Sequence, residues 1–327
     1  MNYQTIKLDK TMYRHEKGFL GHLEELDPSV AYQGGPLAGL DAFERQLNRF
    51  GIKVKGAGSS TVSKFFATSE SAALFPEYVA RAVAQGTKDS GILQEIIASR
   101  TDINALDYRS ITTDLDQNDL SAAIAEGAAI PETNITLSEN LVKLKKRGRL
   151  LKTSYEAIRF QRVDVVSVAL AQIGSYIAKA HLKDAVQVLL SGAPESVAAG
   201  GDALAYGDLL ALWGLFDEFD MSVLLASPDM MLEILAIEEL RDPVLGMGFQ
   251  NTGAMATPLG ARLLKSAAVP AGTVIALDKR FALEMVTAGG VQVEYDKLID
   301  TQLERAAITS ICGFNKIFPG AVKLLKK

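Results

Sequence analysis

The stretch "LLKTSYEAIRFQRVDVVSVALAQIGSYIAKAHLKDAVQVLL", residues 150–190, holds the strongest helical pattern in the chain. "TSYE" at 153–156 matches a capping box, which announces helical chain. The apolar stripe that follows comprises Val166, Leu170, Ile173, Ile177, Leu182, Val186 and Leu189. We predict a helix over residues 163–190, ended by Gly192, with a length of about 42 Å at 1.5 Å per residue. Such a helix is long for a globular domain and suits a structural spine.

The chain before this helix reads as extended. Residues 106–151 alternate polar and apolar residues in the manner of strands. Between Ser110 and Leu141 the charged residues are all acidic: Asp114, Asp116, Asp119, Glu126, Glu132 and Glu139. A basic run follows at once, with Lys143, Lys145, Lys146, Arg147, Arg149 and Lys152. The pattern predicts a long hairpin with one acidic limb and one basic limb.

The basic run has three interpretations. Lysine and arginine protect the solvated edge of a sheet against unwanted pairing. A nucleic-acid groove is disfavoured, because residues 141–154 lack the aromatic side chains on which bases stack. The third interpretation is docking on acidic protein, either the chain's own outgoing limb or a neighbouring subunit. For the third we expect inter-subunit contacts at Lys143, Lys145, Lys146, Arg147, Arg149, Glu126 and Glu132.

The first third of the chain has short elements and little apolar density. "PLAGLDAFERQLNRFG" predicts a helix over residues 36–51, and a second helix is expected over 76–84, ended by Gly86. "KVKGAGSSTVS" at 53–63 is typical of a flexible linker. We therefore expect residues 1 to about 105 to form an arm that lies over another surface.

Mixed helix and strand patterns follow the spine. Residues 207–219 read as a helix and 221–227 as a buried strand, and a further helix has Ser227 as N-cap and Pro228 as its first residue. Further strands are predicted at "TVIALD", "VQVEYD", "AAITSICGF" and "GAVKLL". The expected fold class is α+β.

Composition narrows the function. The chain has 327 residues and a formal net charge of −5, which argues against a dedicated nucleic-acid binder. The single cysteine, Cys312, excludes an internal disulfide and fits a reducing compartment. The start lacks the apolar core of a signal peptide. The longest near-apolar run, 165–178, is short and carries Gln172, so no membrane span is expected and the chain reads as cytosolic at synthesis.

No catalytic constellation emerges from the sequence. His15 and His22, with Glu16, Glu24 and Glu25 nearby, lack the spacing of a two-histidine zinc helix and read as solvated residues. "GAGSST" lacks the features of a phosphate-binding loop. Trp213, Cys312 and the methionines of "PDMM" are expected in the core, and His181 is expected to be packed or on the surface. The sequence thus predicts no catalytic, cofactor-binding or metal-binding residues.

The order of these pieces resembles a tailed-bacteriophage major capsid protein with the Hong Kong 97-like capsid fold. The most specific stretch is "EGAAIPETNITL" at 126–137, running into "LLKTSYEAI" and the long helix. "LLASPDMMLEIL" resembles the family's strand-to-helix step in the axial domain, and "ITSICGFNKIFPGAVKLL" its closing strand pair. The resemblance covers residues 106–324 well, and the first 103 residues by position alone.

This resemblance implies five parts. They are an N-terminal arm with short helices over 1–105, an extended β-hairpin loop over 106–151, a peripheral domain with the spine over 152–197, an axial α/β domain over 198–290, and C-terminal strands over 291–327 that return to the peripheral domain. Some members cross-link the shell through a lysine just before the loop's Pro-Glu. Ile130 stands there before Pro131 and Glu132, so this cross-link is not expected.

The implied function is structural, with no cofactor. Copies of the chain would assemble as pentamers and hexamers into an icosahedral or prolate phage head that encloses double-stranded DNA by weak contacts. A separate scaffolding protein and a portal would take part, in the host cytoplasm and without a membrane. An encapsulin shell that encloses protein cargo is the nearest alternative. A cytosolic α/β enzyme with sites between the subunits of a small ring is a further one.

Overall fold

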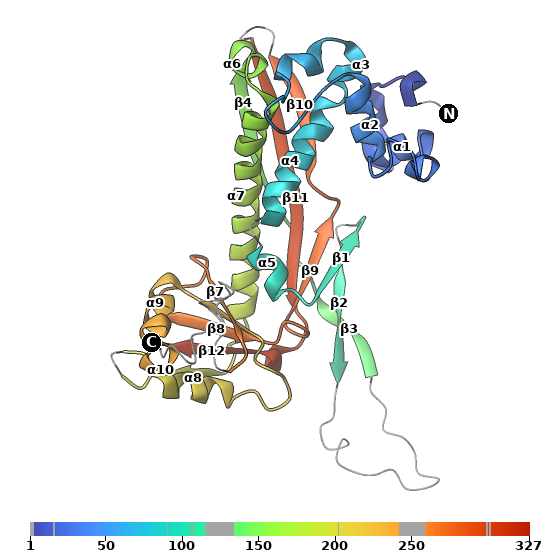
Figure 1. Ribbon diagram of the computed structural model, residues 1–327. Helices are drawn as coiled ribbons and strands as arrows, with labels where there is room; N and C mark the ends of the chain where they lie inside the picture. Colours follow the sequence, from blue (N-terminus) through green and yellow to red (C-terminus); the bar gives the residue numbers. More distant parts are fainter. Residues whose placement is uncertain are drawn as a thin grey trace. The chain divides into compact units, whose positions relative to one another are not determined.

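The computed structural model describes residues 3–15, 17–89, 91–105, 107–114, 134–201, 203–241, 259–298, 300 and 302–327. The chain forms two compact units. Unit 1 comprises 1–90, 147–178 and 291–310, and unit 2 comprises 91–146, 179–290 and 311–327. Figure 1 names the elements within each unit.

The spine helix α7, Val163–Leu190, has the predicted bounds, and Gly192 after it has φ +73°. Its residues up to Ala178 belong to unit 1 and the rest to unit 2. The predicted stripe faces a core in each unit: Leu170 and Ile177 are buried in the first, and Leu182, Val186 and Leu189 in the second. By length and composition α7 could span a membrane, but its stripe packs into two protein cores.

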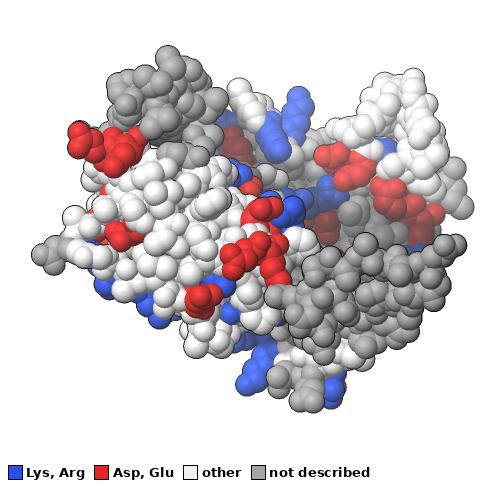
Figure 2. Space-filling model, turned by 90° about the horizontal axis from the view of Figure 1, so that it is seen from below, with Lys and Arg blue, Asp and Glu red and all other residues white. Residues whose placement is uncertain are grey.

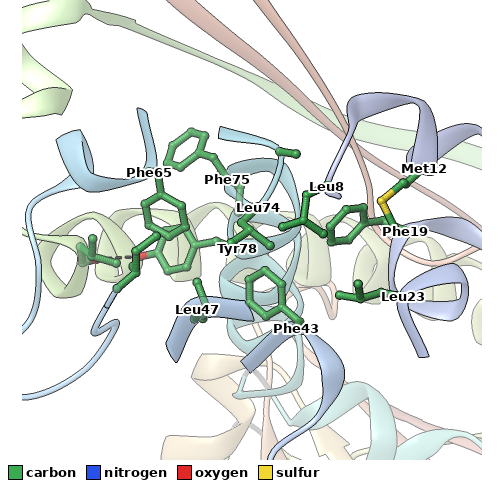
Figure 3. Close-up of a cluster of buried hydrophobic side chains, with 14 of the residues drawn as sticks. Leu8, Met12, Phe19, Leu23, Phe43, Leu47, Phe65, Leu74, Phe75 and Tyr78 are labelled. Carbon is green, nitrogen blue, oxygen red and sulfur yellow. Dashed lines mark hydrogen bonds between the residues drawn. The ribbon is translucent and has the colours of Figure 1, made fainter. Parts of the chain in front are cut away.

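Unit 1 is a cluster of short helices packed on the first part of the spine. The helices are η1 Tyr3–Thr5, η2 Lys10–Arg14, α1 Gly18–Leu26, η3 Ser29–Tyr32, α2 Ala42–Arg49, η4 Val62–Phe66, α3 Ser69–Ala72 and α4 Phe75–Asp89. Phe19, Phe43, Phe65 and Phe75 are buried in its core (Figure 3). The Tyr78 hydroxyl there donates a hydrogen bond of 2.6 Å to the carbonyl of Val163. The expectation of little apolar density in the first third is therefore wrong.

Two helices of unit 1 differ from their predicted bounds. α2 begins at Ala42 and not at Pro36. Its N-cap is Asp41, whose carboxylate accepts a hydrogen bond from the Glu44 amide in a capping box, so Pro36 lies outside the helix. The linker predicted over 53–63 is shorter than expected, because Val62 and Ser63 belong to η4, and Arg162 donates to the carbonyls of Gly56 and Ala57.

α4 continues through Gly86, which was expected to end it. The glycine serves a close helix crossing instead. A Cβ at Gly86 would lie 2.0 Å from the carbonyl oxygen of Ala171, and one at Gly174 would lie 2.1 Å from that of Val83. Both glycines therefore let the backbones of α4 and α7 approach each other.

Three strands also contribute to unit 1. β10, Gln292–Leu298, pairs antiparallel with the first part of β11, Leu303–Lys316, in a register that joins Gln292 to Thr309. β4, Lys145–Ser154, also pairs with β11. After β4 comes the short helix α6, Tyr155–Arg159, where the Ser154 hydroxyl accepts from the Ala157 amide at 3.2 Å. The cap is thus Ser154, one residue after the predicted Thr153.

Unit 2 contains the end of β11, which pairs antiparallel with β9, Leu283–Ala288, and β9 pairs parallel with β1, Ser99–Ile103. The short helix α5, Ile92–Ile96, precedes β1. A two-stranded ribbon is formed by β2, Arg109–Asp114, and β3, Asn134–Leu141, which lie side by side (Figure 1).

A second sheet of unit 2 has the order β5-β12-β8-β6-β7. Its strands are β5 Ser196–Ala198, β6 Val223–Ala226, β7 Arg262–Lys265, β8 Thr273–Leu277 and β12 Val322–Lys326. In β6, Val223 and Leu225 face the core that includes the end of the spine, while Leu224 and Ala226 face a core with the helices. Burial of both faces explains why this strand is apolar throughout rather than alternating.

Three helices accompany this sheet: α8 Tyr206–Trp213, α9 Pro228–Ala236 and α10 Glu238–Arg241. Pro228 is the first residue of α9, as predicted, and Met230 is buried. α8 ends at Trp213 instead of continuing to residue 219. Trp213 is 51% exposed, so its expected place in the core is wrong. Cys312 and His181 are buried.

Candidate inter-subunit contact surface

Where the structure describes both segments, the basic strand does not pair with the acidic limb. β4 lies against β11, while β3 is the strand that returns along β2. The prediction of one hairpin with an acidic and a basic limb is therefore wrong. Alternation of polar and apolar residues indicates strands but does not determine which strands pair. Gly148 marks the close approach of β4 to β11, since a Cβ there would lie 2.5 Å from the carbonyl oxygen of Ile308 in β11.

Within unit 2, Lys143, Lys145 and Lys146 are all exposed. The Lys145 ammonium forms an ion pair of 2.8 Å with the nearly buried carboxylate of Asp184 in α7. Among the described residues, Lys143 and Lys146 have no ion-pair partner. Their charges therefore face solvent in the single subunit.

Within unit 1, Arg147 is half-buried and Arg149 and Lys152 are exposed. The guanidinium of Arg149 lies 5.2 Å from the centre of the Tyr176 ring in α7, a cation–π contact. Part of the basic run thus interacts within its own chain. Glu126 and Glu132, the acidic members of the predicted contact set, lie outside the described residues, as does Ile130.

The β2–β3 ribbon carries an apolar face that sequence reasoning did not single out. Ile111 and Leu137 are direct cross-strand partners, and they are 50% and 67% exposed. Leu141 on β3 is 49% exposed. A two-stranded ribbon is marginally stable alone, and clustered exposed apolar side chains mark an interaction surface.

A buried carboxylate holds the base of this ribbon. Glu284 in β9 accepts hydrogen bonds from the Thr101 hydroxyl at 2.7 Å, the Tyr108 hydroxyl at 2.6 Å and the Ser110 hydroxyl. Burial, and then the Glu284 carboxylate, raise the pKa of Tyr108. Three hydroxyl donors satisfy a charge that no cation neutralises among these contacts. Thr101 and Ser110 lie 183 and 174 positions before Glu284 in the chain. No local sequence pattern indicates contacts between residues so far apart.

Few of the described side chains could react or bind a metal ion. Burial raises the pKa of the Cys312 thiol to about 12, so it is protonated at neutral pH and a poor nucleophile. His15, His22 and Glu25 in unit 1 have candidate ligand atoms within 4.8 Å of one another.

The fold is that of viral shells. The chain is similar to the virus-like particle protein from Pyrococcus furiosus, with 12% identity, a TM-score of 0.54, and coverage of 77% of this chain and 99% of that one. It is similar to the capsid of a native GTA particle, with 17% identity, a TM-score of 0.55, and coverage of 72% and 90%. It is also similar to the capsid of cyanophage P-SCSP1u, with 13% identity, a TM-score of 0.52, and coverage of 72% of this chain and 87% of that one.

Sequence comparison gives the family directly. A family profile described as "Phage capsid protein" matches residues 138–309, more than half of the chain. No curated protein matches the sequence. The chain belongs to the phage capsid protein family, and its fold is the Hong Kong 97-like capsid fold. It is a major capsid protein, a structural component of the virion that self-assembles into the phage head shell.

Proposed function

We propose that the shell formed by this chain encloses double-stranded DNA, and that it assembles in the host cytoplasm with a separate scaffolding protein and a portal. The five parts that the resemblance implies would have different roles in the shell. The ribbon β2–β3 would belong to the extended loop that reaches a neighbouring copy. The sheet of unit 2 with α8 and α9 would belong to the axial domain at the five- and six-fold positions. Its strand β12 pairs with β8, so the end of the chain would lie in the axial domain, and the expected return to the peripheral domain would apply to β10 and the first part of β11.

One observation carries the contact proposal: the ribbon exposes Ile111, Leu137 and Leu141 in the single subunit. Covering this face with a second copy would remove apolar surface from water, worth about 25 cal/mol per Å². Each shell subunit makes many such contacts, and linked weak contacts add up to a stable assembly.

The basic run supplies a second contact in this proposal. Lys143 and Lys146 would face acidic protein of a neighbouring copy, where charge complementarity favours one docking arrangement. Lys145 contributes less, because Asp184 already neutralises it.

Packaged DNA would be held weakly. The chain has a net charge of −5, and on the face drawn in Figure 2 the acidic and basic side chains are interspersed in small groups. A lining with few phosphate contacts allows later release of the genome.

One double charge variant, one apolar variant and one apolar control test the contacts. We expect Lys143→Glu with Lys146→Glu, and separately Leu137→Thr, to fold normally by circular dichroism yet to abolish shells in negative-stain microscopy. Val30→Thr is the matched control, because Val30 is 73% exposed on η3 in unit 1. Normal shells from both sets of variants would refute the proposed contacts, as would equal loss of shells in the control.

A further inference from the structure

His15, His22 and Glu25 lie together beside the turn that joins η2 to α1. His22 and Glu25 are three residues apart in α1 and therefore share a face of the helix. His15 follows η2, and its ring lies 4.4 Å from that of His22, centre to centre. All three offer a ligand atom within 4.8 Å of the others.

One nitrogen in this group lacks a partner. His22 Nδ1 is shielded from solvent and accepts or donates no hydrogen bond among the described residues. The Glu25 carboxylate is 3.8 Å from it, too far for a hydrogen bond. A shielded polar atom without a partner costs free energy, on the order of 1–3 kcal/mol. An ion held by Glu25 beside His22 Nδ1 would give this nitrogen a partner.

The packing beneath the group holds its backbone in place. Met12, Phe19 and Leu23 point into the core of unit 1 (Figure 3). The Tyr13 ring stacks on Phe19 at 4.5 Å. Gly18, at φ +67°, makes the turn between the two helices. The two stacked imidazoles and the carboxylate would have to rotate so that their ligand atoms, now within 4.8 Å of one another, converge on one ion, on a scaffold that is already folded.

We propose that His15, His22 and Glu25 bind a divalent transition-metal ion, with Zn²⁺ as the best-suited ion. Two imidazole nitrogens and one carboxylate oxygen form a ligand set that zinc accepts at about 2.0–2.2 Å. Calcium and magnesium prefer oxygen ligands throughout. The bound ion would clamp η2 to α1 and stiffen the start of the chain.

Lys17 provides a sensitive internal check. Its ammonium contacts the Glu25 carboxylate, and this contact, followed by the charge of Lys17, lowers the pKa of Glu25. The same ammonium competes with a metal for the carboxylate and repels it. Removing Lys17 should therefore tighten metal binding, an effect that a merely structural cluster would not show.

The test uses the full chain without a polyhistidine tag, titrated with Co²⁺ by absorption spectroscopy and with Zn²⁺ by calorimetry. We expect one equivalent to bind, and affinity to fall at least tenfold in His22→Ala and in Glu25→Gln. Lys17→Met should bind several-fold more tightly. Glu218→Gln, which alters an exposed glutamate in unit 2, should leave affinity unchanged.

Several results would overturn the proposal. One is a visible cobalt spectrum with the folded chain that is the same as that of the aqueous ion. Another is equal affinity in the parent and in His22→Ala, with circular dichroism showing that both fold. Persistent binding in a His15→Ala, His22→Ala double variant would place the ion elsewhere. None of these outcomes bears on shell assembly, which rests on other residues.

Discussion

Two glycines fix how closely helices α4 and α7 cross. Gly86 and Gly174 each face a backbone carbonyl of the other helix at a distance that no Cβ could occupy. The sequence predicts a helix end at Gly86, but α4 continues to Asp89. A glycine in a helical pattern has several uses, and the choice depends on a neighbour far away in the chain.

We predict that Gly174→Ala destabilises the subunit by about 1–3 kcal/mol, because the added methyl group forces the helices apart. This loss outweighs the gain in helix propensity, which is about 1 kcal/mol. Gly207→Ala in α8 is the control, since a Cβ there meets no atom within 4 Å. Denaturant unfolding of both variants measures the difference, and equal stabilities would contradict the close crossing.

The Asp278 carboxylate after β8 is buried and accepts several hydrogen bonds. Burial alone would raise its pKa, but hydrogen bonds from Arg280 and from the backbone amides of Asp220 and Arg280 lower it overall. The folded pKa therefore lies below the unfolded value of about 3.9. The stabilisation is present above pH 3.9 and is lost as the pH falls through the folded pKa.

Asp278→Asn should accordingly cost about 1–2 kcal/mol at pH 7, and the gap to the parent should close at acidic pH. Urea unfolding between pH 2.5 and 7 measures this. Asp217→Asn, at an exposed position in the same unit, is the control. A gap that stays constant across the whole range would show that the charge of Asp278 is not the cause.

At the scale of elements, the sequence predicts the spine and the unit 2 strands β6, β8 and β12, but it predicts neither β1, β5, β7 and β9 nor the partners of the strands. α7 carries a long apolar stripe at helical spacing. β6 and β8 are unbroken apolar runs apart from Thr273 at the start of β8. The partner of β4 depends on where β11 lies, more than 150 residues later in the chain. The apolar face of the ribbon and its anchor Glu284 likewise arise from tertiary pairing.

We expect Glu284→Gln to loosen the ribbon β2–β3. A glutamine directs an NH₂ group at hydroxyls that now donate to a carboxylate, so at least one hydrogen bond is lost, worth about 2 kcal/mol when the acceptor is charged. Amide hydrogen exchange in β2 and β3 should accelerate by on the order of tenfold, since 1.4 kcal/mol corresponds to that factor. Glu294→Gln, exposed on β10, is the control. Unchanged exchange in Glu284→Gln would refute the anchoring role.

At the scale of the whole molecule, the single chain leaves surfaces that a shell would cover. The ribbon exposes Ile111 and Leu137, and the unit 1 part of α7 exposes Val165 and Val168 at 57% and 70%. Monomeric proteins seldom leave such apolar groups clustered. The family membership explains them, because a capsid protein completes its packing when copies assemble.

Electron microscopy of the expressed protein tests this account most directly. The purified chain, alone and together with a scaffolding protein, is imaged by negative stain and then by cryo-electron microscopy. The account predicts closed shells built from pentamers and hexamers, with the β2–β3 ribbon of each copy seated on a neighbour. A chain that stays a monomer or a small ring under both conditions would contradict it.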